Sequence, residues 1–279
     1  MPALFKRKSV KIIALCLATV IFIALVLEIG ILLRSQYEVY LPDYEKTDIS
    51  GILKKEELSD SDYEILFMQT GLTRLGIDGL RDRGLEKRII RIQDQYFEKQ
   101  NYYLNSFAPF TGYLSRNTRP EVAEFALLEN GDILYSPTTY FSFVRLGHTS
   151  LVVDASRGYM AQASGFGSPV KYVQIEHFFS RPAFAILRVN TEVGQAVTDY
   201  TKGELIGVRY SLLAGFFGDK APKELNSTHC SHFIWYAYMQ SGVDIDSNGG
   251  KIVTPDNIFY SEAVSVVQIY GINPEKVFK

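Results

Sequence analysis

The chain has 279 residues, enough for one large domain or two small ones. Lys and Arg total 29 and Asp and Glu total 31, a near-balance that excludes the basic surface typical of nucleic-acid-binding proteins. Aliphatic and aromatic residues make up 47%, so the chain can bury a sizeable core. Of the two cysteines, Cys16 lies in an apolar N-terminal run and Cys230 lies far from it, so we expect no disulfide.

Residues 10–33 are almost wholly apolar. A helix of this length, at about 1.5 Å per residue, spans a hydrocarbon core of about 30 Å. A cleaved signal peptide is the alternative, but its apolar region is normally shorter, and no A-x-A-like site precedes Arg34. Lipid attachment at Cys16 is disfavoured because Leu15 stands where a small residue is expected. We therefore expect an uncleaved transmembrane anchor.

The charges on the two sides of this span predict its orientation. Basic residues precede it at Lys6, Arg7, Lys8 and Lys11. Arg34 follows it, but three acidic residues come soon after, at Glu38, Asp43 and Glu45. By the positive-inside rule, residues 1–9 are expected in the cytoplasm and the chain after Arg34 outside the cell membrane.

Two regions separate the anchor from the first predicted strand. Residues 34–58 are polar with little periodicity, which favours a tether. Residues 59–125 are expected to form a helical region, because Ser59 is a cap-type residue and residues 85–103 show an amphipathic helical pattern. No recognisable chemistry lies in this region.

The pattern changes at residues 126–279. Short apolar segments separated by turn residues predict an antiparallel sheet, with strands at 132–135, 147–154, 159–163 and 184–189. Cap-type residues 226–228 then precede an apolar helix that holds Cys230 in its first turn and ends at Gly242. Thr254 and Pro255 begin another helix. The predicted fold class is α+β, with an antiparallel sheet packed against the Cys230 helix.

Cys230 is a candidate nucleophile because of its place at a helix N-terminus. The helix dipole and the free N–H groups stabilise a thiolate there, and the same N–H groups can hold an oxyanion. An inert buried thiol is the alternative, since free cysteines are often buried. Position alone does not decide between the two.

His148 and Gln162 are the candidate partners of Cys230. His148 opens a strand of the sheet that packs on the Cys230 helix, where a neutral imidazole could accept the thiol proton. A two-strand hairpin could bring Gln162 beside it, so that the Gln162 side-chain oxygen accepts the imidazole N–H. The alternatives are a histidine bonded to backbone and an ordinary polar strand residue.

His229 and His232 flank Cys230, so a metal cluster with His148 is an alternative role for these residues. The spacing is not one that metal ligands usually show, and His232 should point roughly 200° away from Cys230 on a helix of 3.6 residues per turn. We therefore expect neither a metal nor another cofactor.

Three segments, at residues 131–153, 160–178 and 230–246, together resemble one family. They are similar to the circularly permuted, YiiX-like branch of the NlpC-type cell-wall peptidase superfamily, which has a papain-like fold. Ordinary members run from cysteine to histidine, whereas here His148 precedes Cys230, as in the permuted branch. The resemblance covers roughly half of the chain.

The resemblance implies that residues 126–279 are a permuted papain-like catalytic domain. Cys230 would be the nucleophile, His148 the base and Gln162 the residue that orients the imidazole. Glu is frequent at this last position, and neutral Gln stabilises imidazolium less. Tyr210 is expected to lie near the site, as a substrate or oxyanion contact.

The expected function is that of a cysteine peptidase or amidase that cleaves an amide, in peptidoglycan stem peptides or a related envelope molecule. One alternative is a lipid acyl hydrolase or acyltransferase, as in the lecithin:retinol acyltransferase group. Another is a non-catalytic envelope-binding module, which the Cys–His pair disfavours. The expected partners are the membrane, through residues 10–33, and a peptidoglycan peptide or lipid substrate.

Overall fold

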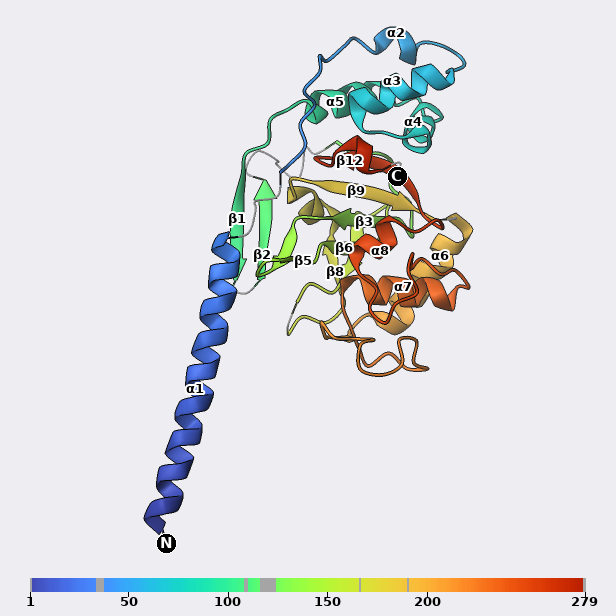
Figure 1. Cartoon of the computed structure of the whole chain (residues 1–279). Helices are drawn as coiled ribbons and strands as arrows, with labels where there is room; N and C mark the ends of the chain where they lie inside the picture. The colour runs from blue at the N-terminus through green and yellow to red at the C-terminus, as the bar shows by residue number, and fades with distance from the viewer. Residues whose placement is uncertain are drawn as a thin grey trace.

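An antiparallel sheet of six strands lies at the centre of the computed structural model, which describes residues 2–33, 38–107, 110–115, 124–165, 167–189 and 191–277 (Figure 1). Its spatial order is β12-β9-β3-β6-β7-β8, and every pairing is antiparallel. The strands are β3 (Ile133–Ser136), β6 (His148–Asp154), β7 (Tyr159–Gln162), β8 (Lys171–Gln174), β9 (Phe184–Arg188) and β12 (Ser265–Tyr270). Together with the helices, this sheet makes the chain α+β, as predicted.

The four predicted strands are confirmed as β3, β6, β7 and β9, with ends that differ by at most one residue. The edge strands β8 and β12 were not predicted. Most of β8 is exposed, so it lacks an apolar alternation. In β12 the apolar run is interrupted by Gln268, which is buried and accepts a hydrogen bond from the Ala126 amide at 2.6 Å.

Successive residues of the central strands face opposite sides of the sheet and enter two different apolar clusters. Ile133 and Leu151 pack in the cluster that contains the buried face of α7 (Cys230–Gln240). Leu134 and Val152 pack in the cluster of three helices: α3 (Asp60–Thr70), α4 (Arg74–Arg81) and α5 (Glu86–Tyr96). The sheet is therefore buried on both faces.

Two further α-helices lie between β9 and β12 in the chain. They are α6 (Thr191–Tyr200), which continues into the π-helix η3 (Thr201–Leu205), and α8 (Pro255–Phe259). Thr254 caps α8 in a capping box with Pro255 at the first turn, as predicted. Two 3₁₀-helices complete this part, η2 (Ile175–Ser180) and η4 (Pro274–Lys276).

The prediction of helical structure across residues 59–125 is correct only for its first half. Ser59 caps α3 as expected, but the helix predicted over 85–103 ends at Tyr96. A hairpin of β1 (Tyr102–Phe107) and β2 (Phe110–Ser115) follows, and β2 pairs with β4 (Thr139–Phe141), which pairs with β5 (Val144–Arg145). The partner strands are remote in sequence, so a local helical pattern could not reveal this second sheet.

The predicted tether over residues 34–58 is also wrong in part. Residues 34–37 lie outside the described part of the chain. Beyond them, the Tyr40 amide donates to the Gly271 carbonyl at 3.0 Å. Ile49 and Leu53 are buried against the α3–α5 cluster, beside the short helix α2 (Ser50–Leu53). Burial of these two apolar side chains holds the segment on the folded body.

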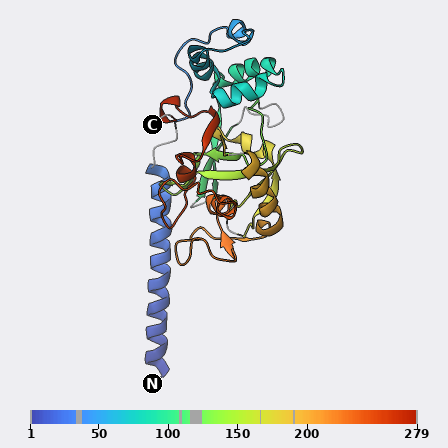
Figure 2. The same ribbon diagram turned by 90° about the vertical axis from the view of Figure 1, so that its right-hand side faces the viewer.

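The N-terminal helix α1 (Pro2–Leu33) projects away from the rest of the molecule (Figure 1, Figure 2). Its stretch Lys11–Leu33 is long and apolar enough to cross a membrane, and its side chains are exposed. Near its C-terminal end, the Ser142 hydroxyl donates to the Leu27 carbonyl at 2.8 Å. Gly30 permits this approach, because a Cβ there would lie 2.4 Å from the Ser142 Oγ. The tip between β4 and β5 thus touches α1.

Candidate active site

Cys230 is the first residue of α7, as predicted. The preceding residue, His229, has an extended backbone (φ −128°, ψ 179°), and its side chain does not cap the helix. The His229 side chain therefore offers no hydrogen-bond acceptor to the first-turn N–H groups of α7. They give the helix a partial positive charge beside Cys230.

The Cys230 thiol lies against the start of β6. Hydrogen bonds from the Thr149 amide and hydroxyl, and from Ser231, act to lower the pKa of the thiol. Burial has the larger effect and raises that pKa above its ordinary value. Because the Thr149 amide belongs to the peptide bond with His148, the sulfur lies beside the first residue of β6.

His148 is held by Gln162, the residue that the family resemblance indicated. The Nε2 of His148 lies 3.0 Å from the Oε1 of Gln162, and the Ser150 hydroxyl lies 3.4 Å from the same oxygen. With Gln162 as acceptor, Nε2 carries the imidazole proton, so Nδ1 is the ring nitrogen that can accept one. The Phe178 ring stacks on the imidazole with centroids 6.4 Å apart.

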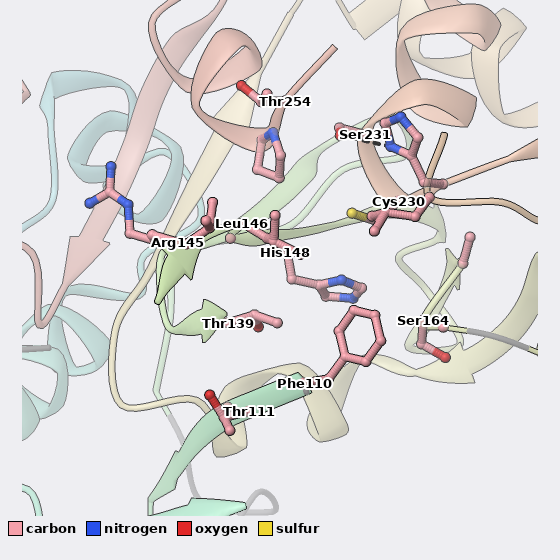
Figure 3. A pocket seen from close by; sticks show the side chains of 18 of the residues that line it. Phe110, Thr111, Thr139, Arg145, Leu146, His148, Ser164, Cys230, Ser231 and Thr254 are labelled. Carbon is pink, nitrogen blue, oxygen red and sulfur yellow. Dashed lines mark hydrogen bonds between the residues drawn. The ribbon is translucent and has the colours of Figure 1, made fainter. Parts of the chain in front are cut away.

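Cys230 and His148 line the same cavity, which has a volume of about 550 Å³. Figure 3 shows the two side chains entering it from α7 and β6. Among the described residues no hydrogen bond joins the thiol to the imidazole, so in the resting structure the two groups line one cavity without bonding to each other. Catalytic contacts often tighten only when substrate binds.

Burial determines the resting charge of the pair. It lowers the pKa of His148 to about 3, helped by the nearby positive charge of Arg181 and opposed by the Gln162 hydrogen bond. It also raises the pKa of the thiol. Both groups are therefore neutral near pH 7, and His148 is free to act as a proton acceptor.

Arg181 is a site residue that sequence reasoning missed. It lines the cavity, and its Nη1 donates to the Thr139 hydroxyl at 2.9 Å. Its guanidinium lies 5.4 Å from the Phe178 ring centroid, and its charge acts on both His148 and Cys230. The sequence around Arg181 does not distinguish it from a surface residue, because most arginines are solvent-exposed.

Tyr210 also lines the cavity, as expected. It lies in β10 (Arg209–Tyr210), which pairs in parallel with β11 (Ser227–Thr228) immediately before Cys230. Burial raises the pKa of the Tyr210 phenol, and the charge of Cys230 contributes in the same direction. The phenol is therefore neutral near pH 7 and can act as a hydrogen-bond donor.

The two histidines beside Cys230 hold the start of α7. The ring of His232 lies 2.8 Å from the Lys220 carbonyl through Nε2 and 3.1 Å from the Thr228 hydroxyl through Nδ1. The Nδ1 of His229 lies 3.3 Å from the Ser231 hydroxyl. Within the described part of the chain, no group of three His, Cys, Asp or Glu residues is placed to hold a metal ion.

The walls of the cavity come from segments far apart in the sequence. One wall is the β1–β2 hairpin, which sequence analysis did not anticipate, and another is the β4–β5 hairpin. Apolar side chains from three further segments complete it: Leu146, Leu212, Ile252 and Val253. Comparison of the chain with protein-family models, curated proteins and solved structures finds no match.

Proposed function

We propose that this protein is a membrane-anchored cysteine hydrolase that cleaves an amide bond. One observation carries the proposal: Cys230, at the uncapped N-terminus of α7, shares a cavity with His148, whose Nε2 is held by Gln162 at 3.0 Å. This is the nucleophile–base–orienting-residue arrangement that cysteine hydrolases need. We assign residues 126–279 to a permuted papain-like domain, because His148 precedes Cys230 in the chain.

The proposed reaction has two halves. In the first, His148 Nδ1 accepts the thiol proton as the Cys230 sulfur attacks the carbonyl carbon, and the α7 N–H groups bind the oxyanion. The C–N bond breaks, the imidazolium donates its proton to the leaving amine, and a thioester remains. In the second half, His148 accepts a proton from water as the oxygen attacks the thioester, a carboxylic acid leaves, and the imidazolium returns its proton to the Cys230 sulfur. Gln162 keeps the Nε2–H tautomer throughout.

We propose an amide in cell-wall peptides as the substrate. The support comes from the expected orientation of the anchor, in which basic residues at the start of the chain stay in the cytoplasm. The domain after α1 then lies on the side of the membrane where peptidoglycan is found.

A specific observation favours a second candidate, an acyl lipid. The β4–β5 hairpin forms a wall of the cavity, and its tip touches α1 through Ser142 and Leu27. Phe143 at this tip is 62% exposed. An acyl chain could therefore enter the largely apolar cavity from the bilayer that α1 would span.

The test is to incubate the purified full-length protein in detergent with peptidoglycan fragments and, separately, with phospholipids, and to identify products by mass spectrometry. Cys230→Ser protein is the matched control. New amine and carboxylic acid products from peptide fragments support the amidase, and free fatty acid supports the lipid hydrolase. If neither substrate changes relative to the Cys230→Ser protein, a binding role replaces both proposals.

A further inference from the structure

Arg181 is a charged residue of the cavity wall that makes few polar contacts with the rest of the described chain. A guanidinium carries five N–H donors, and the structure gives its side chain one hydrogen bond, from Nη1 to the Thr139 hydroxyl at 2.9 Å. Among the described residues, no carboxylate lies within the 4.0 Å of an ion pair with Arg181. The side chain is only partly covered, so it can be reached from the cavity.

Two other arginines show the usual arrangement in this protein. Arg145, which also lines the cavity, pairs with Asp256 at 2.5 Å. Arg188 pairs with both Asp132 and Glu129, at 2.7 and 2.8 Å. Arg181 thus stands apart from these two, each of which has its own carboxylate partner.

An unpaired guanidinium in a desolvated position is costly to the folded protein. Burial lowers the pKa of Arg181 to about 10, because desolvation disfavours the charged guanidinium. The Thr139 hydroxyl and the Phe178 ring hold the guanidinium in place on the cavity wall. An anion that entered the cavity would complete this site.

We propose that Arg181 binds a free carboxylate of the substrate close to the scissile amide, so that the enzyme selects acidic peptides over their neutral counterparts. The inference rests on the proposed function. It names a carboxylate because the planar guanidinium fork matches a planar carboxylate and binds it through two N–H groups. The carboxylate is placed near the amide because Arg181 lines the same cavity as Cys230 and His148.

The competing role is that Arg181 stabilises only the thiolate of Cys230. The two roles have different kinetic consequences. A thiolate-stabilising residue acts equally on every substrate, whereas a carboxylate-binding residue changes the ratio between an acidic substrate and its neutral analogue.

The experiment uses full-length protein in detergent and two probes: a cell-wall stem peptide with free carboxylates and the same peptide with those groups converted to primary amides. The wild type should prefer the free acid in kcat/KM by roughly tenfold to a hundredfold, as expected for a hydrogen-bonded charge pair. Arg181→Gln should bring the ratio to about one, because it slows cleavage of the free acid more than cleavage of the amidated peptide, and circular dichroism checks that the variant is folded. Arg181→Lys should keep part of the preference.

Arg157→Gln is the matched control, because Arg157 is exposed beyond the opposite end of β6. Its preference for the free acid should equal that of the wild type. The inference is overturned if the wild type cleaves both peptides alike, or if Arg181→Gln slows both by the same factor.

A binding measurement separates this inference from the proposed reaction. Calorimetry with Cys230→Ser protein should show that the acidic peptide binds at least about tenfold more tightly than the amidated one, and that Arg181→Gln removes the difference. If this holds while the wild type cleaves neither peptide, the inference stands and the proposed hydrolysis fails. If a soluble short-chain phosphatidylglycerol binds more tightly than the acidic peptide, the carboxylate assignment is overturned.

Discussion

The imidazole of His148 and the side-chain amide of Gln162 meet across neighbouring strands, with Nε2 and Oε1 3.0 Å apart. The antiparallel register pairs Leu151 with Ala161, which places Gln162 opposite Ser150 and on the same face of the sheet as His148. This contact holds Nε2 in its protonated form and leaves Nδ1 as an acceptor.

Cys230→Ala should abolish hydrolysis, by about 10⁴-fold or more, because no other thiol lies in the described cavity. Iodoacetamide should inactivate the wild type and label Cys230. Cys16→Ser is the matched control, since Cys16 lies in α1, and it should keep full activity and sensitivity. A chelator should leave activity unchanged. Loss of activity to chelator that zinc restores would instead indicate a metal at the residues around Cys230.

Gln162→Leu should reduce kcat/KM by roughly tenfold to a hundredfold, because the imidazole loses the acceptor that fixes its tautomer. Gln162→Glu should raise the pKa of His148, since a carboxylate stabilises imidazolium. His148 must be neutral to accept a proton, so the acid limb of the kcat/KM profile should move to higher pH. Gln174→Leu, at an exposed position of β8, should change neither quantity. Unaltered kinetics in Gln162→Leu would assign the orienting role to another residue.

The rate of Cys230 alkylation should depend on pH in a way that reports the resting charge of the pair. Burial raises the pKa of the thiol and lowers that of His148 to about 3, so the resting thiol is protonated. The alkylation rate should then rise about tenfold per pH unit from roughly pH 6 to 8. Mass spectrometry of iodoacetamide-labelled Cys230 measures this alkylation rate as a function of pH in wild-type and His148→Gln protein. A plateau across this range would reveal a thiolate–imidazolium pair instead.

The ion pair of Arg188 with Asp132 should matter strongly for stability. Arg188 donates to both Asp132 oxygens, at 2.7 and 2.8 Å, and burial raises the pKa of the Asp132 carboxyl. Arg188→Met should lower the free energy of unfolding by about 3–5 kcal/mol, because it leaves a buried carboxylate unpaired. Urea unfolding followed by the fluorescence of Trp235, the single tryptophan, measures the loss.

The exposed pair of Lys46 and Asp94 provides the comparison for this stability measurement, with side chains 42% and 59% exposed. Lys46→Ala should cost less than about 1 kcal/mol. Equal losses in Lys46→Ala and Arg188→Met would show that burial does not distinguish the two pairs.

Protease added to intact spheroplasts should digest the chain after Arg34 and leave α1 in the membrane. The reason is the excess of basic residues before the span, which favours a cytoplasmic N-terminus. Immunoblotting for an epitope at the C-terminus measures the digestion, with a cytoplasmic protein as the control for lysis. Digestion that occurs only after lysis would reverse the topology.

The sequence alone determined those features that depend on neighbouring residues. The apolar run predicted α1, short apolar segments between turn residues predicted β3, β6, β7 and β9, and cap-type residues predicted that Cys230 would lie in the first turn of a helix. Each of these patterns reflects burial or hydrogen bonding within a few residues. The resemblance added the expectation that His148 and Gln162 belong beside Cys230.

Only the tertiary structure decided which distant segments meet. It placed the β1–β2 hairpin on the cavity, packed the predicted tether against the α3–α5 cluster, and brought Arg181 to the wall beside His148. Strand pairing and cavity walls join residues far apart in the chain, so no local pattern encodes them. A charged side chain in particular reads as exposed until the fold covers it, because its burial depends on what the rest of the chain places around it.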